Sequence, residues 1–149
     1  MNATELSLFV DLTLGCFTKT FNEPPSLQPP SIEFSSSNYL DHTGVIDISG
    51  RSTGCVYLTV THALAEELLA EMGEPERTAE TCRDLVGELA NTISSNARSH
   101  FGEQFKISIP RTFSEPPGDL AMPFSTFVLP LQWRDREAIL VIGLVEPTE

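Results

Sequence analysis

Residues 80–101 read ETCRDLVGELANTISSNARSHF and form the longest segment of the chain with a clear helical period. At about 100° per residue, the apolar side chains fall on one broad face: Cys82, Leu85, Val86, Leu89, Ala90, Ile93, Ala97 and Phe101. Thr78, or Thr81 with Asp84 three residues later, can cap the start, and Gly102 is placed to end the helix in the left-handed conformation. The sequence therefore predicts a helix of about six turns whose apolar face needs a core.

A narrow polar stripe runs along one edge of this helix and consists of Asp84, Glu88, Asn91 and Ser95. Their spacing of i, i+4, i+7 and i+11 keeps the four side chains in line on a helix. The stripe therefore faces solvent or a partner. Taken alone, Glu88 is typical of a solvated surface carboxylate and Asn91 of an ordinary exposed polar residue, because charged side chains are rarely buried.

Length and charge restrict the kind of protein. A chain of 149 residues and 16.4 kDa suits one domain, residues 1–149, around a single core. Its 9 basic and 21 acidic residues give a net charge of −12, which argues against nucleic acid as a partner. No apolar run approaches the roughly 20 residues of a membrane span, and the N-terminus lacks a basic region and a small-residue cleavage site. The expectation is a cytoplasmic protein that binds neither nucleic acid nor membrane.

The cysteines and histidines give no ligand motif. The three cysteines are Cys16, Cys55 and Cys82. They are odd in number, far apart and set in apolar segments, which predicts core thiols in place of disulfides. The three histidines are His42, His62 and His100. Their spacing from the cysteines matches no zinc motif, so the sequence predicts no metal site.

The remaining periodicity predicts an α+β fold. Before the long helix we expect a helix over 3–21, an extended proline-rich connector over 22–30, a weak strand from Ser31, strands over 42–49 and 54–61 joined by a glycine-bounded turn, and a short helix capped by Thr61. After the long helix we expect a strand over 105–110 that resumes through Phe113, a loop over 114–123, and a hairpin of 124–133 and 137–145. Residues 138–145 are apolar enough for a central strand covered on both faces. Helices segregated from runs of strands indicate an antiparallel or mixed sheet packed against the long helix and the N-terminal helix.

Five segments of the chain carry a recognisable pattern: DLVGELAN at 84–91, Asn96-Ala97-Arg98, Ser108-Ile109-Pro110, the opening LFVDLTLGCF and the hairpin VIDISGRSTGCVYLTV. Together they resemble the CheC/CheX family of chemotaxis phosphatases. The chain has a single Glu-x-x-Asn pair of this kind, Glu88 and Asn91, and is in this respect similar to CheX and unlike the two-site CheC. A bare Glu-x-x-Asn occurs by chance in roughly one chain of this length in three, so its place on the polar stripe is what makes it informative. The family usually carries glycine four residues after the asparagine, where this chain has the nearly as small Ser95.

The resemblance implies a CheC/CheX-like fold and a phosphatase that hydrolyses the aspartyl phosphate of a CheY-type response regulator in chemotaxis or two-component signalling. Asn91 would position the attacking water, because a neutral carboxamide can accept from water and donate to a phosphoryl oxygen. Glu88 would pair with the regulator's active-site lysine, and Asp84 and Ser95 would line the rim of the contact. The resemblance further implies that the regulator supplies Mg²⁺, that the chain needs no cofactor of its own, and that it forms a homodimer joined partly by strand pairing.

Two other functions stay open at this point. A non-catalytic module could bind response regulators or flagellar-switch components through the same helix face. An unrelated small-molecule-binding domain would need a concave apolar pocket, which periodicity cannot reveal. The lifetime of the phosphoryl group on the partner separates the phosphatase from the binding module.

Overall fold

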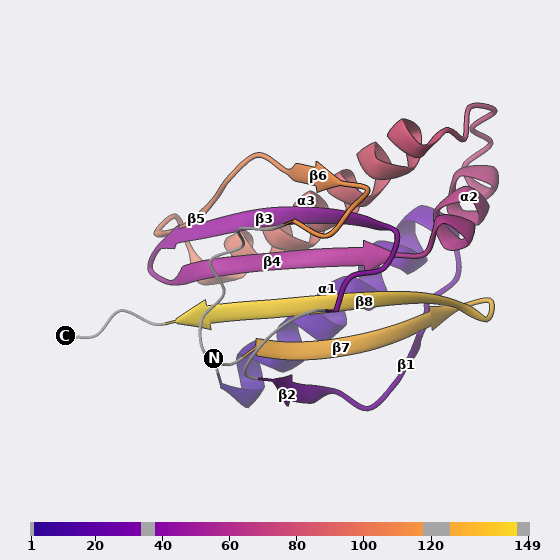
Figure 1. Ribbon diagram of the computed structural model, residues 1–149. Coiled ribbons are helices and arrows are strands. Elements are labelled where there is room, and N and C mark those ends of the chain that lie inside the picture. The colour runs from indigo at the N-terminus through magenta and orange to yellow at the C-terminus, as the bar shows by residue number, and fades with distance from the viewer. Residues whose placement is uncertain (1, 34–37, 118–125, 146–149) are drawn as a thin grey trace.

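The long helix lies against one face of an antiparallel sheet in the computed structural model, which describes residues 2–33, 38–117 and 126–145 (Figure 1). The helices are α1 (Ala3–Phe21), α2 (His62–Glu71) and α3 (Ala79–Phe101). The strands are β1 (Ser26–Leu27), β2 (Ser31–Glu33), β3 (His42–Gly50), β4 (Thr53–Val60), β5 (Phe105–Ile107), β6 (Arg111–Phe113), β7 (Thr126–Trp133) and β8 (Arg136–Val145). This arrangement confirms the predicted α+β class.

The strands pair in the order β1-β7-β8-β4-β3-β5, with β2 also on β7 and β6 also on β3, and every pairing is antiparallel. Both predicted hairpins are present, β3 with β4 and β7 with β8. Arg134 and Asp135 turn the second hairpin with φ of 51° and 66°, the positive values of a type I′ turn that matches the twist of the strands. The predicted loop over 114–123 lies partly outside the described residues, and residues 114–117 contain no helix or strand.

Side-chain caps define the ends of the helices. Asn2 and Glu5 form a reciprocal capping box at the start of α1. The Thr78 hydroxyl accepts from the Thr81 amide, so Thr78 is the residue that caps α3. Gly102 ends α3 as predicted, but the expected left-handed conformation was wrong, because φ is 97° and ψ is 176°, outside the left-handed helical region. The Phe105 amide donates to the Gly102 carbonyl at 3.1 Å, so a tight turn connects α3 to β5.

The core lies between the helices and the sheet. The predicted apolar face of α3 is buried from Cys82 to Ala97, and Phe101 is partly buried. Phe9, Phe17 and Phe21 of α1 join the same cluster, which confirms that α1 and α3 cover one sheet face. The other face carries a smaller cluster, which comprises Val45, Cys55, Tyr57, Val128 and Val141 with Tyr39 and Phe113 packed on it. Strand β8 is therefore covered on both faces, as its apolar sequence predicts.

Two glycines allow α3 to approach β3 closely. A Cβ atom on Gly44 of β3 would lie 2.7 Å from the Cα of Gly87 in α3, and a Cβ atom on Gly87 would lie 2.7 Å from the Thr112 Cγ2. Both distances are shorter than carbon atoms tolerate, so a side chain at either position would push helix and sheet apart. This contact sits one residue before Glu88 and holds the central turns of α3 on the sheet.

Of the helices in the described part of the chain, none has the length and apolar character that a membrane crossing requires.

Replacing Gly44 with alanine should lower the free energy of unfolding by about 1–3 kcal/mol, the usual cost of overpacking. The new methyl group meets the backbone of α3, which cannot rotate away as a side chain can. Gly15→Ala is the matched control, because no atom lies within 4 Å of its added Cβ and alanine favours a helix interior. Chemical denaturation measures both variants, and equal stability for Gly44→Ala and wild type would contradict the close contact of α3 with β3.

Candidate functional site

The four residues of the polar stripe lie on the uncovered edge of α3. Asp84 and Glu88 are exposed, whereas Asn91 and Ser95 are half-buried. Their neighbours Leu85 and Leu89 are 7% and 3% exposed, so the boundary between core and stripe falls within single turns of the helix. The apolar face of α3, from Cys82 to Ala97, is buried against the sheet. Rotating the helix to hide the stripe would therefore expose these core residues.

Within the described residues, the side chains of Glu88 and Asn91 form neither an ion pair nor a hydrogen bond with another group of the chain. The Glu88 carbonyl accepts from the Thr92 hydroxyl at 3.0 Å, a contact that leaves its carboxylate untouched. Glu88 and Asn91 are one turn apart and thus neighbours on the helix surface. The pair offers one carboxylate and one carboxamide to a partner.

The connection between β5 and β6 runs beside this part of α3. Ser108 anchors it, since its hydroxyl accepts from the Asp47 amide and its own amide donates to the Asp47 carbonyl, both at 2.9 Å. Arg111 adds a two-pronged ion pair with the Asp47 carboxylate at 2.8 and 2.9 Å. Pro110 lies against Gly87, and the Ile109 side chain is 84% exposed. A fixed loop with one protruding apolar side chain therefore borders the stripe.

A hollow of about 410 Å³ lies at the C-terminal end of the stripe. It is lined by Ser95, Arg98, Ser99, Gly102, Glu103 and Ile107. Ile107 is the only large apolar side chain in this lining, whereas small-molecule sites are mostly apolar. Neither this hollow nor the convex helix edge beside it favours the small-molecule alternative.

All three cysteines are buried and none forms a disulfide, which confirms the prediction of core thiols. Burial raises the pKa of Cys16 to about 11 and that of Cys55 to about 12, so neither is a thiolate near neutral pH. Burial also raises the pKa of Cys82, with a smaller contribution from Glu66. These environments argue against a reactive nucleophile at any of the three positions.

Cys82 nevertheless belongs to a cluster that sequence spacing did not reveal. The structure brings it together with His42 and His62, although about 20 residues separate each member from the next. No local motif links the three, because they come from the start of β3, the start of α2 and the second turn of α3. Burial and the neighbouring His62 lower the pKa of His42, so its ring is held neutral.

A family model described as Chemotaxis phosphatase CheX matches residues 42–129 of the chain. The matched region runs from β3 through α3 into β7, and so contains the stripe and the Gly44–Gly87 contact. A comparison with curated proteins found no match.

Solved structures with the same fold cover nearly the whole chain. A CheC-like superfamily protein from Shewanella sp. PV-4 is 24% identical with a TM-score of 0.83, over 97% of this chain and 99% of that one. The chemotaxis protein CheX from Vibrio vulnificus is 21% identical with a TM-score of 0.81, over 96% and 100%. The CheX–CheY–BeF3–Mg²⁺ complex from Borrelia burgdorferi gives 15% identity and a TM-score of 0.76, over 95% and 98%. These likenesses establish the CheC/CheX-like fold, and because the family match spans more than half of the chain, the protein belongs to the CheX family of chemotaxis phosphatases.

Proposed function

We propose that this protein hydrolyses the aspartyl phosphate of a CheY-type response regulator by presenting the edge of α3 that carries Glu88 and Asn91. The observation that carries this proposal is the state of that pair: both side chains are accessible and unengaged within the described residues, on the helix at the centre of the family match. A pair that served only to stabilise the fold would be expected to contact the rest of the chain.

The chemistry of Asn91 suits the reaction. Hydrolysis of an aspartyl phosphate passes through a loose transition state, so most of what a protein can contribute is positioning and electrostatic stabilisation. The carboxamide oxygen of Asn91 would accept from the attacking water, and its NH₂ group would donate to a phosphoryl oxygen. Because the amide is neutral, it would not repel the phosphoryl dianion as a carboxylate would.

Glu88 would hold the partner. Its exposed carboxylate lies one turn before Asn91, where an ion pair with the regulator's active-site lysine would align the two surfaces. Asp84 and Ser95 would form the rim of the contact, and the exposed Ile109 on the connection between β5 and β6 would add an apolar point of contact. The Borrelia structure contains CheX together with CheY, BeF3 and Mg²⁺, which supports a partner of the CheY type. We infer that the Mg²⁺ of the reaction is bound by that partner.

Replacing Glu88 should weaken binding of the phosphorylated regulator. Glu88→Ala removes the proposed ion pair, and Glu88→Lys adds like-charge repulsion and should weaken binding further. Isothermal titration calorimetry with the regulator in its BeF3-bound form measures both affinities. Glu137→Lys makes the same charge change at an exposed position on β8 and serves as the control. Wild-type affinity in both Glu88 variants would remove Glu88 from the interface.

The non-catalytic binding module remains the second candidate, because Ser95 stands where the family usually carries glycine. A slightly larger residue on the contact edge could preserve binding and impair the approach that chemistry requires. The phosphoryl lifetime of the regulator, measured with and without this protein, decides between the two. Binding without a shorter lifetime would favour the module.

The homodimer implied by the family resemblance stays a prediction. Strands β1 and β2 lie at one edge of the sheet, and they carry the exposed apolar side chains of Leu27 and Ile32, which are 41% and 59% exposed. An open edge with apolar side chains can pair with a strand of a second copy. We therefore propose this edge as the region where strand pairing would occur.

A further inference from the structure

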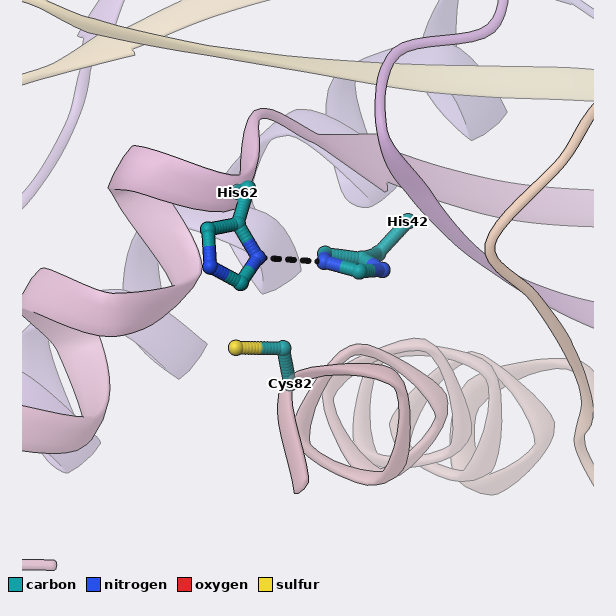
Figure 2. A group of neighbouring side chains, drawn as sticks. All are labelled: His42, His62 and Cys82. Atoms are coloured by element: carbon teal, nitrogen blue, oxygen red, sulfur yellow. Dashed lines mark hydrogen bonds between the residues drawn. The ribbon is translucent and has the colours of Figure 1, made fainter. Parts of the chain in front are cut away.

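Three side chains with metal-binding atoms converge where β3, α2 and α3 begin (Figure 2). His42 begins β3, His62 begins α2, and Cys82 lies in the second turn of α3. One ligand atom from each residue lies within 4.8 Å of the others. In Figure 2 a nitrogen of each imidazole ring points toward the other ring, and the Cys82 sulfur lies beside the His62 ring.

The rings are oriented as metal-binding imidazoles are. His42 Nε2 and His62 Nδ1 face each other at 2.8 Å. The outer nitrogens have partners of their own: His42 Nδ1 is 2.9 Å from the Ser114 hydroxyl, and His62 Nε2 is 3.4 Å from the Glu66 carboxylate. A histidine that ligates a metal usually directs its other ring nitrogen to such a partner, which fixes the tautomer and the ring orientation.

We propose that His42 Nε2, His62 Nδ1 and Cys82 Sγ bind a divalent transition metal of the zinc type. Two imidazole nitrogens and one thiolate are ligands that zinc prefers, and three protein ligands leave the fourth tetrahedral position to water. Two nitrogens on one tetrahedral zinc lie about 3.3 Å apart, because each Zn–N bond measures about 2.0–2.1 Å. The rings must therefore separate by about half an ångström from their hydrogen-bonded distance, a small rotation for a side chain at a helix start.

The cluster is open to solvent on one side, where an ion can enter, and is buried on the other sides, where a bound ion is shielded from water. Cys82 and His42 are 0% and 4% exposed, whereas the His62 side chain is 43% exposed and forms the open side. The hydrogen bond between the two rings needs a proton on one inner nitrogen, and on binding this proton moves to the outer nitrogen of the same ring. Binding also replaces the Cys82 Sγ–H bond with an Sγ–metal bond and releases the thiol proton to solvent, without any oxidant or reductant. Two carboxylates lie next to His62: that of Glu66 is 3.4 Å from His62 Nε2, and that of Asp41 accepts a 2.8 Å hydrogen bond from the His62 amide. Their negative charge favours binding of a cation. Arg83, which bonds Ser114, opposes this charge from the far side of His42.

An ion at this point would join the starts of β3 and α2, which the His42–His62 hydrogen bond already links, to the start of α3. The later turns of that helix carry Glu88 and Asn91. Because a metal that binds the folded state adds its binding free energy to stability, occupancy should be visible in unfolding. This inference is independent of the proposed phosphatase activity.

The test uses the full chain, reduced and freed of metal with a chelator. Calorimetric titration with Zn²⁺ should give one site per chain, and a hundredfold excess of Zn²⁺ over Kd should raise the Tm by about 5 °C or more. Co²⁺, as a coloured substitute, should give tetrahedral d–d bands together with a sulfur-to-cobalt charge-transfer band. The absence of saturable binding, or a Co²⁺ spectrum without the sulfur band, would overturn the proposal.

Matched variants locate the ion. Cys82→Ser and His62→Gln should each weaken Zn²⁺ binding by more than about tenfold, since each removes a ligand. Cys16→Ser and His100→Gln change a buried cysteine and an exposed histidine outside the cluster, and both should bind as wild type does. His62→Gln keeps the test decisive if Cys82→Ser does not fold, because His62 is half-exposed. Unchanged affinity in His62→Gln would place any bound ion elsewhere and overturn the proposed site.

Discussion

Replacing Asn91 with alanine should reduce dephosphorylation of the regulator by about a hundredfold or more, the scale seen when one preorganised hydrogen-bonding group is lost. The fold should survive, because the Asn91 side chain is half-buried at the helix edge and has no hydrogen-bond partner among the described residues. Binding should also remain largely intact, since Glu88 is untouched. A single-turnover assay that follows loss of the phosphoryl group from the regulator measures the effect.

Asn91→Asp separates geometry from hydrogen-bond donation. Aspartate keeps the shape of the side chain, but it replaces a donor NH₂ group with an acceptor-only anion beside the phosphoryl oxygens. If shape alone mattered, activity would be retained. The proposed role predicts loss of activity, because the carboxylate cannot donate a hydrogen bond to the phosphoryl group and its negative charge repels that group.

Asn96→Ala is the control, since it removes the same amide from an exposed position on α3 outside the stripe and should leave the rate unchanged. Wild-type rates in both Asn91 variants would mean that this residue does not position the water. The phosphatase proposal for the stripe would then give way to the binding module.

The second large effect concerns stability. Leu89→Ala should lower the free energy of unfolding by about 2–5 kcal/mol, because the transfer term and the cavity left in a close-packed core add up. Leu89 is 3% exposed within the main cluster, beside Glu88, which is exposed. Glu88→Ala should change stability by only about 0.5 kcal/mol or less. Adjacent residues on one helix would thus differ several-fold in their effect.

Urea denaturation followed by circular dichroism measures both variants, and a similar m-value in each would show that the change lies in stability and not in the unfolding mechanism. A large loss of stability from Glu88→Ala, with little from Leu89→Ala, would mean that α3 turns its other side to the sheet. The stripe could not then be the contact surface.

Local periodicity was sufficient for most of the fold. The apolar positions of α3 repeat with the helical period over several turns, so its buried face and its polar edge follow from the residues alone. The same holds for α1, whose predicted bounds of 3–21 agree with the structure, and for the two hairpins, where alternation and turn residues act over short distances. The Thr78 and Thr61 caps are equally local, because each hydroxyl bonds an amide three residues ahead.

The candidate site was likewise predictable from the sequence only where its residues lie close together in the chain. The stripe could be named from the sequence, because its residues share one helix and their spacing alone brings them together. The loop that borders it could not, since the position of Ser108 and Pro110 beside α3 depends on the pairing of β5 and β6 with β3. The function of the pair came from family resemblance and not from periodicity.

By itself the sequence determined the helices, the two hairpins and which side of each helix is buried, because those properties depend on residues a few positions apart. The short strand β1 lies in the segment expected to be an extended connector, since only its pairing with β7 makes it a strand. Only the tertiary structure decided how close α3 approaches β3, the dihedral angles of Gly102 and the meeting of His42 with His62 and Cys82. Each of these depends on the relative positions of elements that are far apart in the sequence. Those positions result from packing the whole core, so the pattern within a single segment cannot predict them.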